Sequence, residues 1–503
     1  MKTVVFVENI SEVKTLKKTR KKIISLNKEV EYWLDEKGVP YTSIADYPAK
    51  RLYFKETTDW LNRISLSEVD GKEIYKHFKY GSVPIWWLLN YFLFYDNLAT
   101  RSITGAIDKT IKFLSVIEKE SPSRIDVLTK NKETFVILKA IAGPRNIAIS
   151  RKGDIQDRGE ITSKGIIYTV YLKRTRSIAN RLWSGLLYLF YPKPKKGGIL
   201  LFSTKKQDIY NPITGSLEKG SRFKPIRAYL RSKSRYISTL ENYEIGLNKT
   251  YKHIRGGDII LDYYINIGSI PKAKRSARNL ERRWHSIKKG LVRKELFSYS
   301  DVNLSEIIIP KIDFFFRHYI YDLILDIEKL RSMLSSIGPS SIATFSPQGF
   351  LGRCTAALSK VPVVGIQHGT LIYCPDFIYP KKAGQKQMPL PDSMAVFGKF
   401  YKDFLIKNSS LQDKSIVITG NPEYDRINAI RNRLERKDIM ARLDINPKKR
   451  IILLATQPNL SIEDKKTLLN LVYLSVKDKD VFLIVKKHPR EKDYDIHKEI
   501  AKK

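Results

Sequence analysis

The chain is poor in cysteine and has no long apolar run. Its 503 residues include only Cys354 and Cys374, which excludes a disulfide-stapled secreted protein and a cysteine-built zinc site. No apolar stretch reaches the roughly 18–20 residues that a membrane span needs. The opening MKTVVFVENISEV lacks the basic and apolar regions of a secretory signal. These absences predict a cytoplasmic protein without a membrane-spanning helix.

Acidic side chains are also scarce relative to basic ones. The chain has 52 Asp and Glu against 91 Lys and Arg, for a formal net charge of +39. An excess of this size predicts a polyanionic partner, either nucleic acid or an anionic membrane face. Hydrophobic residues make up 42% of the chain, which is enough for packed cores and argues against global disorder.

Two short apolar segments are rich in aromatic residues. Val83–Tyr95 (VPIWWLLNYFLFY) is expected to be core. Arg181–Tyr191 (RLWSGLLYLFY) lies in a strongly basic stretch, residues 145–255, which holds 24 Lys and Arg against 7 Asp and Glu. An apolar aromatic segment flanked by cations is typical of a membrane interface. A buried helix followed by a basic linker is the alternative, and the sequence leaves both open.

Short apolar strands alternate with helices along much of the chain, which predicts an α/β fold with parallel sheets. Residues 1–180 are expected to form an α/β accessory domain, which opens with the strand-like TVVFVEN. Residues 197–380 and 391–503 are expected to form two Rossmann-like units that join near Gly365–Pro391. Their predicted strands are ILLF (199–202), IATF (342–345), VPVVGI (361–366), MAVF (394–397), IVIT (416–419), IILLA (451–455) and VFLIV (481–485).

Three polar clusters directly follow predicted strands in the second half of the chain. They are Gln367, His368 and Gly369; Gly420 and Asn421 within TGNPEYD; and Lys487, His488 and Pro489. In open α/β sheets, ligands bind at the carboxyl ends of the strands. Such turns can donate hydrogen bonds to a phosphate or supply a general acid or base. Taken singly, each cluster is also typical of an ordinary polar turn.

The succession VVGIQHG…TGNPEYD…LIVKKHPRE resembles the GT-B surface-polysaccharide transferases of the capsule and teichoic-acid type. These include CDP-glycerol glycerophosphotransferases and polysialyltransferases. The stretch ILLFSTKKQDIYNPITGSLEKGSRFKPI resembles the opening of their acceptor-side Rossmann domain. The resemblance covers about residues 197–503 and leaves the first 180 residues outside it. It implies two Rossmann-type units, with residues 197–380 on the acceptor side and 391–503 on the nucleotide side.

The resemblance also implies roles for the matching residues. His368 would be a base or a phosphate contact, and His488 would protonate or stabilise the leaving phosphate beside the cation Lys487. Gly420 and Asn421 would line the cleft near the nucleotide. The remaining members of the phosphate-binding turns would be Gln367, Gly369 and Pro489. Fixed positive donors stabilise the departing phosphate without a metal, so neither a metal nor a cofactor is expected, and no Asp-x-Asp pair is placed to hold a metal.

The sequence departs from this family near its end. In the family, the His-Pro turn is followed by a Ser/Thr-rich turn and helix that bind the donor phosphate. Here the chain reaches Lys503 soon after Pro489. The nucleotide-side unit is therefore expected to be incomplete, with its missing part truncated or supplied in trans, and the chain as it stands is expected to bind nucleotide weakly and to transfer little.

The leading functional prediction is a glycosyl- or polyol-phosphate transferase. It would use a nucleotide-activated sugar or CDP-polyol donor and a lipid-linked or polysaccharide acceptor, peripherally at the inner face of the cell membrane. One alternative is a nucleotide-sugar epimerase, which shares the two-Rossmann architecture. A second is a nucleic-acid-binding protein with Lys272–Lys294 as a basic recognition helix. Nucleic acid is not expected as a partner, because the chain has no other signature of a nucleic-acid-binding domain.

Overall fold

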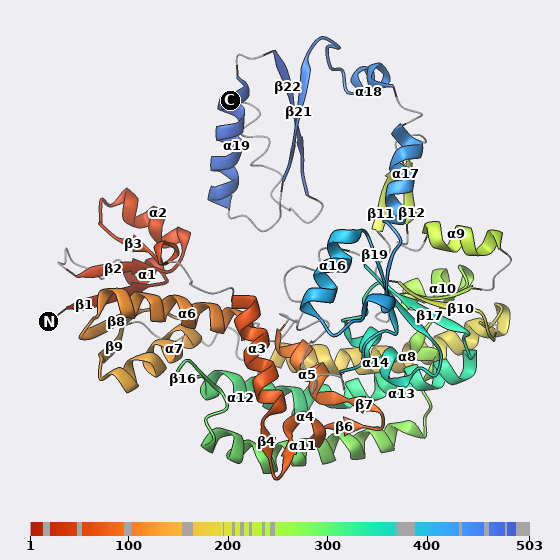
Figure 1. Cartoon of the computed structure of the whole chain (residues 1–503), viewed down its shortest axis with the longest axis horizontal. Helices are drawn as coiled ribbons and strands as arrows, with labels where there is room; N and C mark the ends of the chain where they lie inside the picture. The colour runs from red at the N-terminus through yellow and green to blue at the C-terminus, as the bar shows by residue number, and fades with distance from the viewer. Residues whose placement is uncertain are drawn as a thin grey trace. The chain divides into compact units, whose positions relative to one another are not determined.

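The chain forms two compact units (Figure 1). The first combines Met1–Asp208 with Lys219–Asn421, and the second combines Ile209–Glu218 with Pro422–Lys503. The computed structural model describes residues 2–13, 21–47, 53–94, 103–152, 164–194, 196–203, 207–211, 216–220, 224–233, 237–241, 247–367, 369, 388–431, 435–456, 462–477 and 480–488.

The first unit begins with a five-stranded parallel sheet. Across the sheet its strands are β3 (Thr42–Ser43), β2 (Lys22–Ser25), β1 (Thr3–Val7), β8 (Arg124–Leu128) and β9 (Ala148–Lys152). Successive side chains of a strand point to opposite faces, so Val4 and Phe6 join one apolar cluster while Val5 and Val7 join another. The second cluster lies under α2 (Lys28–Glu36), and α6 (Ile103–Glu120) and α7 (Lys132–Ala142) cover the first (Figure 1). The α/β character expected of this region is confirmed.

Helix α5 (Ile85–Phe94) holds most of the aromatic run that was expected to be core. All of its residues except Tyr91 are buried. Phe78, at the end of α4 (Ile74–His77), stacks on Trp86 with ring centroids 5.1 Å apart. Trp86 in turn contacts Trp284 of α11 (Ser269–Arg293). The prediction that this run is core is confirmed, and its partners lie almost two hundred residues further along the chain.

A seven-stranded parallel sheet forms the larger part of the first unit. Its strands run in the order β14 (Asp258–Ile259), β13 (Ile237–Glu241), β10 (Ile199–Ser203), β17 (Ser341–Thr344), β18 (Val363–Ile366), β19 (Ser393–Val396) and β20 (Ile416–Ile418). The chain starts in the middle, winds to one edge and then crosses to build the other. This is the doubly wound pattern, with its switch point between β10 and β17. The predicted α/β fold class is therefore confirmed.

The position at which this sheet ends corrects one sequence-based assignment. Strands β19 and β20 were expected in the nucleotide-side unit, residues 391–503. Instead, Val364 of β18 pairs with Ser393 of β19, so the segment Gly365–Pro391 does not separate two sheets. The physical reason is burial, because the short strands β19 and β20 insert Met394, Val396 and Ile416 into the same apolar core as β18.

The second unit contains a parallel pair of strands, β21 (Arg450–Ala455) and β22 (Val481–Lys486). Their positions match the predicted strands IILLA and VFLIV. Its helices are α17 (Pro422–Arg431), α18 (Arg436–Arg442) and α19 (Ile462–Val476), and a second strand pair is formed by β11 (Gln207–Asn211) and β12 (Ser216–Gly220). Leu469 of α19 is buried and packs with Leu454 of β21, so α19 covers one side of this pair.

The long helix α8 (Lys164–Phe190) contains the second aromatic segment. One side of it is buried through Asn180, Ser184, Leu187 and Tyr188. Its other side is exposed, so the segment is not simply a core helix. In the part of the chain that the structure describes, no helix is long and apolar enough to cross a membrane.

Asp126 of β8 provides a test of the N-terminal sheet. Burial opposes its charge, but hydrogen bonds from Lys21, Ser150 and Arg124 outweigh burial and hold its pKa well below the usual range. We expect Asp126→Asn to lower the free energy of unfolding by about 2–3 kcal/mol at pH 7, since the buried hydrogen-bonded charge is lost. Urea denaturation followed by circular dichroism measures the difference.

The difference in free energy of unfolding between the parent and Asp126→Asn should depend on pH. A depressed carboxyl pKa contributes stability above the unfolded-state pKa of about 3.9, and that stability disappears as the pH falls. The gap between parent and variant should therefore close below about pH 4. Asp59→Asn is the matched control, because Asp59 forms an exposed pair with Lys55. A gap that persists unchanged at low pH would contradict the assignment.

Candidate functional site

The structure brings two of the three predicted clusters to one edge of the seven-stranded sheet. Gln367 and Gly369 follow the carboxyl end of β18, and Gly420 and Asn421 follow that of β20. Strand β19 lies between β18 and β20, so the two turns leave the sheet roughly 10 Å apart, two strand spacings. This edge is the place where open α/β sheets bind their ligands.

Gln367 holds the first turn in place. Its side chain is buried, and its Oε1 accepts a hydrogen bond from the backbone N–H of Phe397 at 2.8 Å. Its Nε2 donates to the carbonyl of Gly369 at 2.9 Å. The Gln367 amide therefore ties the end of β18 to the end of β19 and to the turn that follows. In this structure the Gln367 side chain fixes the ends of β18 and β19 and the turn after β18, whereas the resemblance had implied a contact between Gln367 and the donor phosphate.

The second turn has a backbone that favours glycine. Gly420 lies in the left-handed region, with φ of +75°. Thr419 donates its N–H to the carbonyl of Val396 at 3.0 Å and its hydroxyl to the Gly420 carbonyl at 3.2 Å. Asn421 is half-buried next to this turn, and Pro422 begins α17, as proline commonly does at the first helical position.

The loop after β17 contributes a part of the same edge that sequence analysis did not assign to the site. It leads into α14 (Phe350–Leu358) beside the switch point of the sheet. A Cβ on Gly352 would overlap the carbonyl of Ser346, and a Cβ on Gly365 would overlap the sulfur of Met394. The close approach of the loop backbone favours glycine at position 352, and the packing of neighbouring side chains favours it at position 365. The spacing Gly349-x-x-Gly352 after an apolar strand was the available signal.

A buried guanidinium lies in the first turn of α14. Arg353 is fully buried, and its Nε donates to the Gln348 carbonyl at 2.8 Å. Its Nη1 lies 3.4 Å from the carbonyl of Trp87 in α5. Arg353 therefore fastens the loop after β17 to the aromatic core helix of the N-terminal region.

The third cluster belongs to the second unit. Lys487 and His488 follow the carboxyl end of β22 and are both partly buried. The backbone N–H of His488 donates to the Thr456 hydroxyl at 3.1 Å, and the Thr456 N–H donates to the Lys486 carbonyl at 3.1 Å. Thr456 at the end of β21 thus fixes the turn that carries His488.

Two predicted site residues, His368 and Pro489, lie outside the described residues. Because all three follow strands, His368, Asn421 and His488 are predicted to converge on one cleft between the two Rossmann-like units. This convergence stays a prediction, since the third cluster is in a different unit from the first two.

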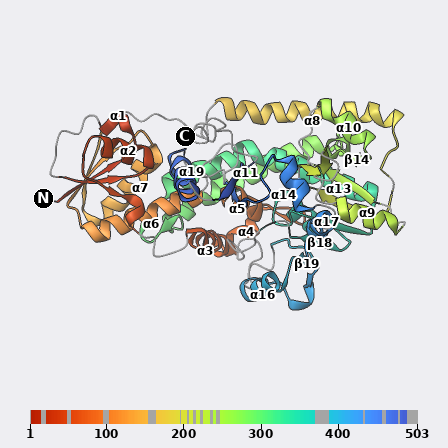
Figure 2. The ribbon, with the colours of Figure 1, turned by 90° about the horizontal axis from the view of Figure 1, so that it is seen from above.

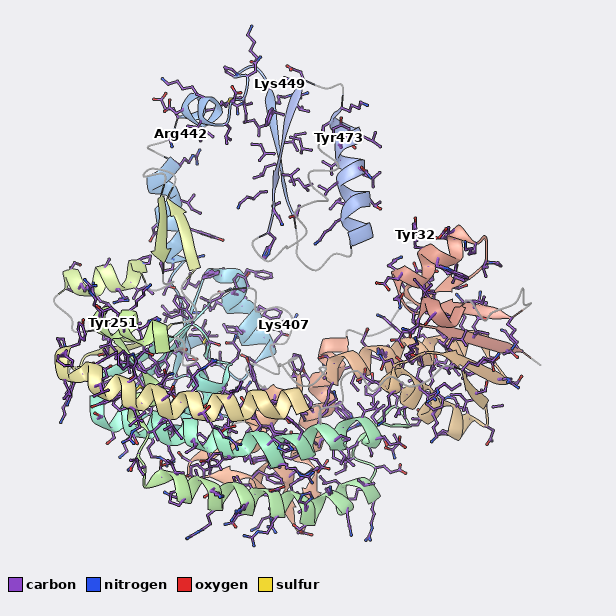
Figure 3. The ribbon with its side chains drawn as sticks, turned by 180° about the vertical axis from the view of Figure 1, so that it is seen from behind. Tyr32, Tyr251, Lys407, Arg442, Lys449 and Tyr473 are labelled. Atoms are coloured by element: carbon purple, nitrogen blue, oxygen red, sulfur yellow. The ribbon has the colours of Figure 1, made fainter. Side chains whose placement is uncertain are left out.

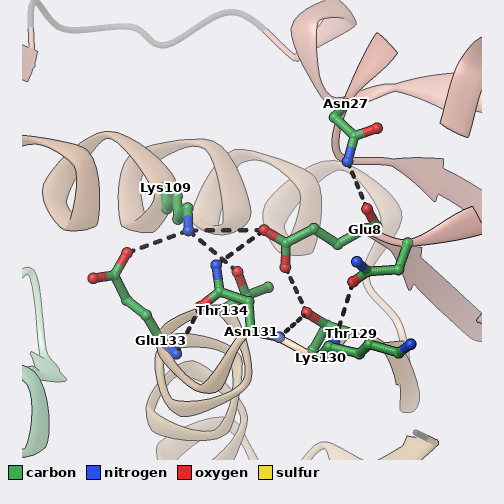
Figure 4. Close-up of polar contacts among 9 residues, drawn as sticks. Glu8, Asn27, Lys109, Thr129, Lys130, Asn131, Glu133 and Thr134 are labelled. Atoms are coloured by element: carbon green, nitrogen blue, oxygen red, sulfur yellow. Dashed lines mark hydrogen bonds and ion pairs between the residues drawn. The ribbon is translucent and has the colours of Figure 1, made fainter. Parts of the chain in front are cut away.

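A further polar cluster, which sequence analysis missed, lies at the carboxyl edge of the N-terminal sheet (Figure 4). The Glu8 carboxylate, after β1, accepts from the Thr129 hydroxyl at 2.5 Å and from the Asn131 amide at 3.2 Å. Lys109 of α6 bonds Glu133 at 3.2 Å. These groups bond mainly to one another, so the cluster stabilises the loops after β1 and β8. The signal was available as the polar residues after TVVFV and RIDVL.

The loops of this edge also begin two helices. Asn27 accepts from the N–H of Val30 and caps α2, and Asn131 accepts from the N–H of Glu133 and caps α7. Asn27 also donates to the backbone carbonyl of Glu8 at 2.6 Å. The same side chains therefore satisfy exposed helix ends and lock the strand ends together. Over the ranges that the structure covers, no group of three or more His, Cys, Asp or Glu is placed to hold a metal ion.

Comparison with known proteins gives only weak likenesses. No family model and no curated protein matches the chain. Among solved structures, the UDP-N-acetylglucosamine 2-epimerase from Rickettsia bellii is 13% identical, with a TM-score of 0.33 over 61% of this chain and 67% of that one. A UDP-GlcNAc 2-epimerase from Methanocaldococcus jannaschii, in complex with UDP-GlcNAc and UDP, is 12% identical with a TM-score of 0.17 over 73% and 83%. At such scores the likeness does not support a particular activity.

The glycine packing at the sheet edge yields a second prediction. We expect Gly352→Ala and Gly365→Ala each to lower the free energy of unfolding by about 2–4 kcal/mol, because the added methyl group overlaps atoms of a tightly packed neighbour. Gly369→Ala is the matched control at the same edge, since no atom lies within 4 Å of its added Cβ. Urea denaturation compares the three variants, and equal stability of all three would contradict the packing argument.

Proposed function

We propose that the chain is a transferase that moves a glycosyl or polyol-phosphate group from a nucleotide-activated donor to a lipid-linked or polysaccharide acceptor. The observation that carries this proposal is the pair of turns after β18 and β20, which emerge at the ligand-binding edge of a doubly wound parallel sheet. The resemblance of residues 197–503 to capsule and teichoic-acid transferases supports the choice of this reaction.

The proposed chemistry is stabilisation of a leaving nucleotide phosphate. His488 would protonate or contact that phosphate, and Lys487 would add a positive charge beside it. His368 would act as the base or as a second phosphate contact, and Asn421 would lie against the nucleotide. A departing phosphate is stabilised most strongly by donors that are already in place before the bond breaks. The proposed reaction uses neither a metal ion nor a cofactor.

The charge of the chain supports a phosphate-rich acceptor at a membrane. Helix α11 buries Trp284 and Leu280 and presents a basic outer side to solvent. The exposed cations on it are Lys272, Lys274, Arg275, Arg278, Arg282, Arg283, Lys289 and Arg293. Each basic side chain close to an anionic lipid surface contributes about 1 kcal/mol. We therefore place the proposed enzyme peripherally at the anionic inner face of the cell membrane.

Two other functions remain candidates. A nucleotide-sugar epimerase would use the same sheet edge but would need no acceptor. A nucleic-acid-binding protein would use the outer side of α11, although its aromatic residue Trp284 is buried and donates its Nε1–H to Asp313 at 2.6 Å. Salt-sensitive binding to DNA in preference to anionic vesicles would favour the nucleic-acid function.

The test of the proposed function is transfer of label. Donors labelled in the sugar or polyol, with CDP and UDP as carriers, are incubated with the chain and a polyprenyl-phosphate-linked acceptor. We expect a small but detectable amount of label in the lipid fraction, whereas an epimerase would convert the nucleotide sugar and leave the lipid unlabelled. Isothermal titration of CDP, CMP and UDP tests donor binding separately, and no binding of any of them would contradict the proposal.

His488 gives the sharpest prediction for this reaction. We expect replacement of His488, at its matching position in a complete homologous transferase, by Ala to lower turnover by roughly 100-fold or more, the scale seen when one positioned acid or charge stabiliser is lost. His285→Ala is the control, because His285 lies on α11 with its side chain 38% exposed and 3.9 Å from Glu281. Turnover by His488→Ala at the parent rate would remove His488 from the mechanism.

A further inference from the structure

We propose that the outer side of helix α8 lies in the interface of an anionic lipid membrane and docks the chain there. The outer side is defined by Ile178, Leu182, Trp183, Leu186, Leu189 and Phe190. This inference goes beyond the proposed transfer reaction and holds whichever reaction the chain catalyses.

The outer side of α8 is an apolar stripe on the surface of the first unit. Its six side chains are between 40% and 81% exposed. The spacing of Ile178, Leu182, Leu186 and Phe190, four residues apart, places them on one side of the helix. In Figure 2, α8 runs along the margin of the first unit beside α10 (Leu247–Arg255), and in Figure 3 it lies on the side of that unit nearest the viewer. A contiguous exposed apolar stripe of this kind marks an interaction surface.

The inner side of α8 is polar along most of its length and apolar only near its end, where Leu187 and Tyr188 pack with Ile254 and Ile260. Asp262 accepts from Ser177 at 2.5 Å and from Asn180 at 3.0 Å. Arg174 donates to Asp322 at 2.8 Å and to the His318 carbonyl at 3.1 Å. A helix of a soluble protein normally turns its apolar stripe to the core. Here many of the buried contacts are hydrogen bonds and ion pairs, and the longer apolar stripe is left outside.

A buried lysine fixes α8 in this orientation. Lys329 of α13 (Ile320–Ile337) is almost wholly buried and bonds Ser177 at 2.8 Å, Asp262 at 2.9 Å and Asp326 at 2.7 Å. Turning the apolar stripe inward would remove Ser177 and Asn180 from this network and leave its buried charges poorly paired. Removing a partner from a buried charge is strongly unfavourable. The exposed stripe is therefore a consequence of the internal packing of the unit.

The charges around the stripe match an anionic surface. Residues 161–207 contain ten Lys and Arg and no Asp or Glu. Arg176, Lys193 and Lys196 are exposed beside the stripe. An apolar helix side bordered by cations is the composition of a helix that lies in the plane of an anionic membrane. Trp183 supplies an amphipathic ring of the kind that favours the headgroup region.

Other occupants fit the surface less well. A nucleic acid would match the cations but would leave the six apolar side chains without a partner. A second copy of the chain would cover the apolar side chains, but it would bring two cationic borders together with no carboxylate from residues 161–207 to pair with them. Anionic lipid satisfies the apolar stripe and the cationic border together.

The test is vesicle binding by the full chain without a nucleotide or an acceptor. We expect sedimentation with vesicles of 30% phosphatidylglycerol in phosphatidylcholine to exceed that with pure phosphatidylcholine by roughly tenfold or more, and to weaken as salt rises. Lipids brominated on their acyl chains should quench the fluorescence of Trp183. Trp183→Phe should remove most of the quenched component, since Trp60, Trp86, Trp87 and Trp284 are buried and Trp33 is partly buried on α2.

Substitutions separate the two parts of the interaction. Leu182→Asn combined with Leu186→Asn should weaken vesicle binding by roughly tenfold or more, because each apolar side chain loses its burial in lipid. Lys193→Gln combined with Lys196→Gln should remove mainly the salt-sensitive part. Tyr32→Asn is the matched control, since Tyr32 is equally exposed on α2, in the N-terminal sheet region (Figure 3). Circular dichroism melts check that every variant is folded.

The outcomes distinguish this inference from the proposed function. Loss of vesicle binding in the double leucine variant with unchanged nucleotide titration supports the membrane surface alone. Equal vesicle binding by the parent and the double leucine variant would overturn it. So would self-association of the parent in the absence of lipid, if the same substitutions abolish it and no vesicles are bound. Failure of nucleotide binding would count against the transferase and leave the membrane result unaffected.

Discussion

The buried charge of Lys329 sets much of the arrangement of the first unit. Burial by itself lowers the pKa of this amine, but Asp326 and Asp262 outweigh burial and raise it, so the amine stays charged. The two carboxylates must then stay beside the amine, which connects α13 to the short helix at Leu261–Tyr264 and to α8. Helix α13 ends at Gly338 in the left-handed conformation and leads directly into β17. The ion network therefore connects α8, through α13, to β17 in the middle of the seven-stranded sheet.

Parallel pairing imposes the second constraint. All carboxyl ends of a parallel sheet lie at one edge, so polar residues that follow different strands gather without any direct preference for one another. Each of the two large parallel sheets of the first unit has such an edge. In the N-terminal sheet, Glu8, Thr129 and Asn131 form a mutually bonded cluster. In the larger sheet, Gln367 ties the strand ends together and leaves the glycine-rich turn at Gly420 beside them.

Local patterns in the sequence predicted individual helices and strands better than they predicted which strands pair with one another. The apolar runs at 199–202, 361–366 and 481–485 contain the strands β10, β18 and β22, and most of the basic stretch 272–294 lies in α11. The sequence could not show that β19 pairs with β18, because pairing depends on which apolar faces meet in three dimensions, and the long connection before Ser393 resembles a linker. The sequence likewise left undecided whether the apolar side of α8 faces outward, because this orientation depends on Lys329, about 150 residues further along the chain.

The sequence predicted where the candidate site residues lie better than it predicted what their side chains do. Polar residues after apolar strands located Gln367 and Gly420 at a shared edge. The buried, hydrogen-bonded state of Gln367 could not be foreseen, because it depends on the backbone of Phe397 in the neighbouring strand. Arg353 was also missed, since a single arginine inside an apolar helix gives no sign that it will bond the carbonyl of Gln348 in the adjoining loop and approach that of Trp87 in the distant helix α5.

The core position of α5 has a consequence for biosynthesis. Its sequence, IWWLLNYFLF, is almost wholly apolar, and its partners on α11 and the following helices are encoded almost two hundred residues later. At roughly 5–20 residues per second, this helix leaves the ribosome on the order of 10–40 s before those partners exist. During that interval its tryptophans have only the preceding residues such as Tyr75 and Phe78 as native partners, and the surface that Trp284 provides is missing. The nascent chain therefore presents a strongly apolar segment of the kind that chaperones bind, and cells that make this protein need holding capacity while the second half is synthesised.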